Sequence, residues 1–228
     1  MPLIVLLCAI AFAASPFWVP GFGGFEADQF PVPQVDPPVQ PAGYAFSIWG
    51  LIYLWLIVGA GFGAWKRWSD PDWAEMRLPL ALSLAVGAVW LPVAVRSPIW
   101  ATVLIWVMLL TALWALWRAP RKDAWAAAWP VGLYAGWLSA ASCVALGLML
   151  AGYGFTGQLL AAWLMVSIAI VLAWAVQRAL GHAPTYGIAV IWALIAVGLQ
   201  NSFAGVGLLA LAGAGALISP TLRAGRGK

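Results

Sequence analysis

Long apolar runs, separated by short polar or proline-rich breaks, follow one another along the whole chain. The runs between these breaks give eight candidate helices, at residues 2–19, 43–65, 78–95, 98–117, 125–150, 158–177, 185–200 and 203–218. A hydrocarbon core of about 30 Å is crossed by roughly 20 helical residues, which is close to the length of most of these runs. The pattern therefore predicts an all-α integral membrane protein with about eight transmembrane helices.

Three of these runs allow a second interpretation. The last two runs are short, and Asn201-Ser202 between them is compatible with either a tight turn or a kink, so seven helices is the alternative. The first run contains "AFAAS", which resembles a signal-peptidase site, but it lacks the basic residues that begin a secretory signal. We therefore expect a retained first helix.

The distribution of lysine and arginine predicts the orientation. If the N-terminus is cytoplasmic and the chain crosses eight times, only Arg96 falls on the outer side. Cytoplasmic loops carry the excess of Lys and Arg, so we expect a bacterial inner-membrane protein with both termini in the cytoplasm. Seven crossings would instead place the last three basic residues outside. The residues on the inner side are Lys66, Arg67, Arg77, Arg118, Arg121, Lys122, Arg178, Arg223, Arg226 and Lys228.

One long connection, residues 20–42, separates the first two runs. Its sequence, "PGFGGFEADQFPVPQVDPPVQPA", is rich in proline and glycine, and all of its charges are acidic. Proline at this density favours extended segments, and long loops are often functional. The loop is predicted to be external, either as a spacer or as a lid whose residues Phe22, Phe25 and Phe30 pack down onto the helices.

The composition limits the classes of function. The chain is 64% hydrophobic and 8% charged, whereas soluble domains carry roughly 25% charged residues. Its net charge of +4 comes from short basic clusters between apolar runs, so we expect no nucleic-acid partner. Cys8, Cys143 and the single His182 offer no metal-ligand spacing. No Asp, Glu, Lys, Arg or His lies deep in a predicted span, which argues against an enzyme and against an ion-coupled pump.

Seventeen tryptophans divide into two groups by their depth in the predicted spans. Amphipathic rings settle at the membrane–water interface without any functional demand. That explanation covers the tryptophans near predicted span ends: Trp18, Trp65, Trp68, Trp73, Trp100, Trp117, Trp125 and Trp129. The deeper group needs another account: Trp49, Trp55, Trp90, Trp106, Trp137 and Trp192.

Helical spacing gathers two aromatic faces. Phe46, Trp49 and Tyr53 share one face of the second helix, and Tyr134, Trp137 and Ala141 share one face of the fifth. At 1.5 Å per residue, Tyr53 lies about 15 Å below the outer start of its span, near mid-membrane. Two such faces, with the small Ala141 leaving space, would line a cavity for a flat apolar ligand. Rings that only pack helix against helix would show the same spacing.

These residues also carry a family resemblance. "PAGYAFSIWGLIY", "VWLPVAVRSPIWA" and "LYAGWLSAAS" resemble, in the same order, motifs of the tryptophan-rich sensory protein family (TspO/MBR), whose mitochondrial member is the translocator protein. The resemblance implies a five-helix bundle over residues 1–150. Residues 151–228 then supply about three additional helices and a short basic tail, as in a longer branch of the family. The matched positions are Trp49, Tyr53, Trp90, Pro92, Tyr134, Trp137 and Ala141.

The resemblance further implies a ligand. Family members bind porphyrins, other tetrapyrroles or sterol-like molecules in the bundle and have sensory, carrier or regulatory roles. The expected binding residues here are Phe46 and the matched positions, with no covalent cofactor and with a tetrapyrrole, a carotenoid or a lipid as ligand. The family often has asparagine where this chain has Gly87 and Ala145, and often a tryptophan in the outer loop. These departures predict a less polar pocket.

Three functions remain open at this point. The first is the binding of a hydrophobic small molecule. The second is an accessory structural subunit of a larger membrane assembly, such as a photosynthetic pigment–protein complex, in which exposed tryptophans contact partner chains or carotenoid tails. The third is a transporter that is not ion-coupled. The lipid bilayer is a partner in each case, and either a homodimer or contacts with other subunits are compatible with the sequence.

Overall fold

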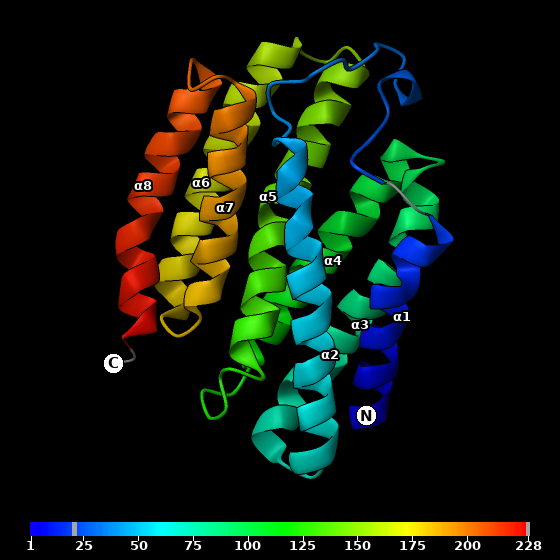
Figure 1. Ribbon diagram of the computed structural model, residues 1–228, viewed down its shortest axis with the longest axis vertical. Coiled ribbons are helices and arrows are strands. Elements are labelled where there is room, and N and C mark those ends of the chain that lie inside the picture. Colours follow the sequence, from blue (N-terminus) through cyan, green and yellow to red (C-terminus); the bar gives the residue numbers. More distant parts are fainter. Residues whose placement is uncertain (20–21, 227–228) are drawn as a thin grey trace.

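The computed structural model describes residues 1–19 and 22–226, which form a bundle of α-helices (Figure 1). The predicted all-α membrane fold is confirmed. Two short 3₁₀ helices, η1 (Ala27–Gln29) and η2 (Gly43–Ser47), lie in and after the long loop. The helices found in the described residues are α1 (Pro2–Trp18), α2 (Ile48–Lys66), α3 (Pro71–Ala94), α4 (Pro98–Arg118), α5 (Ala128–Gly152), α6 (Gln158–Leu180), α7 (Pro184–Gln200) and α8 (Val206–Gly225).

Eight of these helices are membrane-spanning elements. Six are long and apolar enough to cross a bilayer by length and composition. The two shorter ones, α1 and α7, have 17 residues each, the lower end of the range of about 17–25 residues that span a hydrocarbon core. The chain between α7 and α8 reverses in a tight turn, in which Ser202 and Phe203 have positive φ. The two helices are therefore separate, and the described residues form eight α-helices and not seven.

The start of α3 differs from the sequence prediction. We expected the span to begin at residue 78, but the helix begins seven residues earlier, at Pro71. The charged residues Asp72, Glu75 and Arg77 interrupt the apolar pattern without ending the helix. A side-chain oxygen of Asp70 caps the helix by accepting a hydrogen bond from the backbone N–H of Asp72, at 3.0 Å.

Two rings of helices share α5. Helix contacts run α1–α2–α5–α4–α3 and back to α1, which closes a five-helix ring. A second closed set runs α5–α6–α8–α7 and back to α5 (Figure 1). Helix α5 is accordingly buried along most of its length. Its Gly136 lies so close to α7 that an added Cβ would collide with the Tyr186 carbonyl oxygen.

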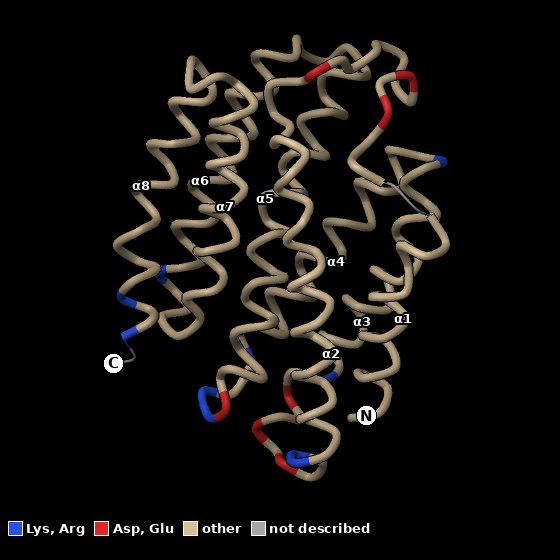
Figure 2. The backbone as a smooth tube through the Cα atoms, viewed as in Figure 1, with Lys and Arg blue, Asp and Glu red and all other residues tan. Residues whose placement is uncertain are grey.

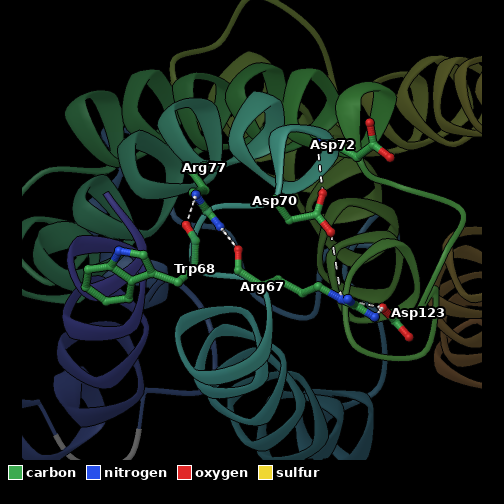
Figure 3. Close-up of polar contacts among 6 residues, drawn as sticks. All are labelled: Arg67, Trp68, Asp70, Asp72, Arg77 and Asp123. Atoms are coloured by element: carbon green, nitrogen blue, oxygen red, sulfur yellow. Dashed lines mark hydrogen bonds and ion pairs between the residues drawn. The ribbon is translucent and has the colours of Figure 1, made fainter.

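Arg77 ties the turn between α2 and α3 together (Figure 3). We expected it in a loop, but it lies in the second turn of α3, where it is buried. Its guanidinium donates to the carbonyl oxygens of Arg67 and Trp68, the latter at 3.0 Å, at the C-terminal end of α2. Arg67 in turn donates to Asp123, with Nε 2.8 Å from Oδ2. This network links the α2–α3 turn to the loop before α5.

The charged residues are segregated to the two ends of the bundle (Figure 2). The beginning of α1 and the end of α8 lie at one end, together with every described Lys and Arg except Arg96 (Figure 2). We call this the basic end. The opposite end, where residues 22–42 lie, is called the loop end and carries Arg96 and the acidic residues of the loop. Lys228, which the orientation prediction also used, lies outside the described residues.

The long loop covers the loop end of the bundle and is attached to several helices (Figure 1). The Gln29 side chain donates to the Ala94 carbonyl oxygen at 3.0 Å, at the end of α3. The Val32 amide donates to Gly152 at 2.9 Å, and the Ala42 amide donates to Ala196 at 3.1 Å. These bonds reach α3, α5 and α7, so the loop has the form of a cover and not of a detached spacer.

Candidate functional site

A cavity of about 230 Å³ lies inside the five-helix ring. All five helices, η2 and the long loop contribute to its walls. Six of the eight residues predicted from the sequence line it, whereas Pro92 and Tyr134 do not. Those six are Phe46, Trp49, Tyr53, Trp90, Trp137 and Ala141.

The two predicted aromatic faces meet across this cavity. Trp49 and Tyr53 of α2 stack with ring centroids 5.3 Å apart and planes inclined by 20°. Trp137 of α5 presents its edge to Trp49 at 6.1 Å and to Phe46 at 5.7 Å. Stacked and edge-to-face pairs are the favoured arrangements of aromatic rings. The α2 side of the cavity is therefore lined by a stacked aromatic pair, which Trp137 contacts edge to face.

Trp90 of α3 closes the cavity toward the loop. Its indole N–H donates to the Ala101 carbonyl oxygen of α4 at 2.9 Å, which fixes the ring. Phe22 and Phe25 of the loop pack on this ring, with centroids 5.4 and 6.5 Å away. Of the three phenylalanines that we predicted to pack downward, Phe22 therefore lines the cavity and Phe25 packs beside it. Phe30 packs away from this cavity, on Gly152 and Tyr153.

Tyr134 lies behind the cavity wall and is fully buried. Its hydroxyl is 3.0 Å from the Oγ of Ser83, which itself donates to the Met108 carbonyl oxygen at 2.7 Å. Because the serine has one proton to donate, Tyr134 is the donor of the first bond. The tyrosine thus joins α5 to α3 and α4. Neither Tyr134 nor Pro92, which lies within α3, lines the cavity.

Phe12 of α1 is a cavity residue that the sequence analysis missed. Its ring is buried and makes edge contacts with Trp49, Tyr53 and Tyr134 at centroid distances of 5.7, 5.0 and 5.6 Å. It lies against Gly87, where an added Cβ would be 2.7 Å from the Phe12 ring. The Phe12 ring therefore occupies the space into which a side chain at position 87 would point. The one hint of this arrangement in the sequence is the glycine at position 87, where the family often has asparagine.

A second apolar cavity, of about 80 Å³, adjoins the first across α5. The two share Trp137 and Ala141 among their lining residues, and the second continues between α5, α6 and α7. Ala145, the other departure from the family pattern, lines it. Its lining side chains are mostly apolar. Apart from the tryptophan ring nitrogens, the polar groups among them are the Gln40 amide and the Cys143 thiol. The two apolar cavities thus lie next to each other beneath the loop.

The tryptophans outside the cavity divide differently from the prediction. Trp73, assigned to the interfacial belt, is only 2% exposed and packs on Gly63 and Phe62. Trp73 of α3 packs here against α2. The position of Trp73 near a predicted span end did not reveal this contact. Most of the other belt residues are exposed, as expected: Trp18, Trp65, Trp68, Trp100, Trp117 and Trp125.

Two of the deep tryptophans serve as hydrogen-bonded links between segments. Trp55 donates to the Trp125 carbonyl oxygen at 2.7 Å, and Trp192 donates to that of Ala45 at 3.0 Å. Neither ring lines the two cavities. Packing therefore accounts for these residues, whereas Trp49, Trp90 and Trp137 surround the cavity.

The fold and the cavity together define a polytopic α-helical membrane protein with an internal aromatic cavity. The sequence model of the TSPO-like protein family matches residues 29–222, and the chain belongs to this family. No curated protein and no solved structure matches the chain. We based the resemblance on residues 1–150, but the family match also takes in α6, α7 and most of α8.

Proposed function

We propose that the protein binds an apolar small molecule in the aromatic cavity, with a sensory, carrier or regulatory role in the membrane. The observation that carries the proposal is the convergence of Trp49, Tyr53, Trp90 and Trp137 on one internal space. Ligand pockets are concave, mostly apolar and largely pre-formed. Interiors are otherwise close-packed, with few voids larger than a water molecule, so a cavity of about 230 Å³ within the ring is compatible with an occupant. The proposed role is binding and not catalysis.

The shape of the space refines the proposed ligand class. The aromatic lining of Trp49, Tyr53 and Trp137 suits a planar molecule such as a tetrapyrrole or a sterol-like lipid, because aromatic rings pack favourably against flat apolar groups. Drug-sized ligands occupy pockets of about 300–1,000 Å³, and the main cavity is smaller than that. A complete tetrapyrrole would require Phe22 and Phe25 to move outward. A narrower apolar group, such as a single isoprenoid chain, would fit the two adjoining cavities with less rearrangement.

The proposed location is a bacterial inner membrane, with the basic end in the cytoplasm. The charge segregation along the bundle supports this orientation, because cytoplasmic ends carry the excess of Lys and Arg (Figure 2). The covered loop end would then face outward. A ligand that enters beneath the loop would come from the outer side or from the outer leaflet.

Extraction of the protein from native membranes tests the proposal and identifies the ligand. The wild-type chain and Ala141→Phe are purified in the same mild detergent, and their organic extracts are compared by absorbance and mass spectrometry. Ala141 lines both cavities, so the added ring should fill the space. We expect one lipophilic compound in near-stoichiometric amount with the wild type and its loss from the variant. The same compound in the same amount from both proteins would refute binding in the cavity.

A role as an accessory subunit of a larger membrane assembly is the second candidate. Its support is the set of exposed tryptophans, such as Trp114 of α4 and Trp163 of α6, on the outer surface of the bundle. Tryptophan is enriched where interfaces form. Extraction in mild detergent should then yield one large complex of fixed composition. A monodisperse monomer or homodimer without co-purifying chains would exclude this role.

A transporter that is not ion-coupled is the remaining alternative. The closed roof of Trp90, Phe22 and Phe25 would have to open for each transfer, so substitutions in the loop should change the rate of flux. Equal ligand flux into vesicles with and without the protein would refute this alternative.

A further inference from the structure

A pocket separate from the aromatic cavity lies between α6 and α8 at the basic end of the bundle. Its volume is about 390 Å³, and none of its lining residues belongs to the two cavities described above. Helix α6 and its cap supply Trp174, Gln177, Arg178 and Gly181, and helix α8 supplies Ala216, Ser219, Pro220, Arg223 and Ala224.

Among the described residues, the positive charge of this pocket has no neutralising partner. Arg178 and Arg223 both line it, and neither forms an ion pair with a described residue. No aspartate or glutamate follows Asp123 in the sequence. At the same end of the five-helix ring, by contrast, Arg67 pairs with Asp123 and Arg118 pairs with Glu75. Two like charges that line one pocket repel each other, and a bound anion would relieve this repulsion.

The polar groups of the pocket suit a phosphate. The Arg178 guanidinium lies over the Trp174 ring, 4.5 Å from its centroid, which holds the planar group in place. Guanidinium groups bind phosphate oxygens through paired, charge-assisted hydrogen bonds. Ser219 of α8 lines the same pocket, and a serine hydroxyl is a further hydrogen-bond donor to phosphate.

The surroundings of the pocket point to a lipid as the source of that phosphate. Val171, Trp174 and Arg178 lie on one face of α6. Val171 lies about one helical turn from Trp174 toward the membrane centre, and its side chain is 67% exposed. On α8, the exposed side chains of Ile218 and Leu222 flank the pocket residues. Basic pockets between transmembrane helices at the cytoplasmic side are known to bind anionic lipid headgroups. We propose that this pocket binds the phosphate headgroup of an anionic phospholipid from the leaflet at the basic end.

Native mass spectrometry of the full chain, with phosphatidylglycerol and phosphatidylcholine added separately, tests the proposal. The wild type should retain one phosphatidylglycerol in preference to phosphatidylcholine. Arg178→Gln and Arg223→Gln should each weaken phosphatidylglycerol binding about fivefold, which corresponds to about 1 kcal/mol, and should leave phosphatidylcholine binding unchanged. Arg178→Lys keeps the charge but loses the planar group, and should give a smaller loss.

Arg118→Gln is the matched control, because Arg118 is an exposed arginine at the same end that pairs with Glu75 and lies outside the pocket. It should leave lipid binding unchanged. An equal loss in this control would overturn the assignment in favour of general surface charge. Displacement of the lipid by inorganic phosphate at millimolar concentration would identify a soluble anion as the ligand and would also overturn it. If a glutamine variant fails to fold, phosphatidylglycerol binding by Arg178→Lys and by Trp174→Leu is compared with that of the wild type instead.

Discussion

Replacement of Trp137 by leucine is the perturbation that acts most directly on the aromatic cavity. The Trp137 side chain is 2% exposed, lines both cavities and packs edge-on against Phe46 and Trp49. Leucine keeps α5 apolar and is a good helix former, so the helix itself should persist. The substitution removes the ring that would contact a bound ligand between α2 and α5.

The expected magnitude follows from the aromatic contact that is lost. One aromatic pair contributes about 0.5–1.5 kcal/mol beyond the burial of its area. At about 1.4 kcal/mol for each factor of ten in affinity, the ligand should bind roughly two- to twelvefold more weakly. Leucine still fills part of the space, so the loss of folding stability should be smaller than the about 3–5 kcal/mol of a buried Trp→Ala substitution.

Saturable quenching of tryptophan fluorescence in lipid nanodiscs measures this change, with a carotenoid and a tetrapyrrole as separate probes. Trp117→Leu is the control, because Trp117 is 55% exposed at the basic end of α4 and lines neither cavity. It should leave the affinity nearly unchanged. Trp73 would be a poor control, since it is buried. Both probes partition into lipid, so equal effects of the two substitutions, or quenching without saturation, would refute the reasoning.

Three further predictions concern packing and topology. Gly87→Ala places a Cβ 2.7 Å from the Phe12 ring and should lower stability in a detergent melt by about 1–3 kcal/mol, with recovery when Phe12→Leu is added. Ser83→Ala leaves the buried Tyr134 hydroxyl without its acceptor and should cost about 1–3 kcal/mol in the same melt, which Tyr134→Phe should largely restore. Single cysteines in η1 and at the end of α8, in a chain without its own cysteines, should react with an impermeant reagent from opposite sides of the membrane. Reaction from one side would rule out eight crossings.

The fold was largely predictable because its main signal is local. Apolar runs of membrane-spanning length gave the helices, and basic clusters predicted which loops share an end. The start of α3 was missed because Asp72, Glu75 and Arg77 look like loop residues. Their place in the helix becomes clear only from the hydrogen bond of the Asp72 amide to the Asp70 side chain and from the contacts of Arg77. The sharing of α5 by two rings depends on which helices touch. Periodicity in a helix that is apolar all round does not carry that information.

The cavity was predictable only where helical spacing or a motif marked it. Spacing grouped Trp49 with Tyr53 and Trp137 with Ala141, and the structure brings these residues to one space. Phe12 has no motif around it, and its role depends on the absence of a side chain at Gly87, on another helix. The position of a residue along a span also does not show whether its side chain lines the cavity or is buried behind the lining residues. Tyr134 shares a helical face with Trp137 yet lies behind the cavity.

Photo-cross-linking with a diazirine-bearing isoprenoid probe in native-like membranes tests the central claim, a ligand held inside the five-helix ring, most directly. Labelled peptides are mapped by mass spectrometry, with and without an excess of unlabelled ligand. The account predicts competable labels on residues 46–53 and 137–145, which Ala141→Phe abolishes. Labels confined to lipid-facing positions such as Val171, unchanged by competitor or by the Ala141 substitution, would contradict it.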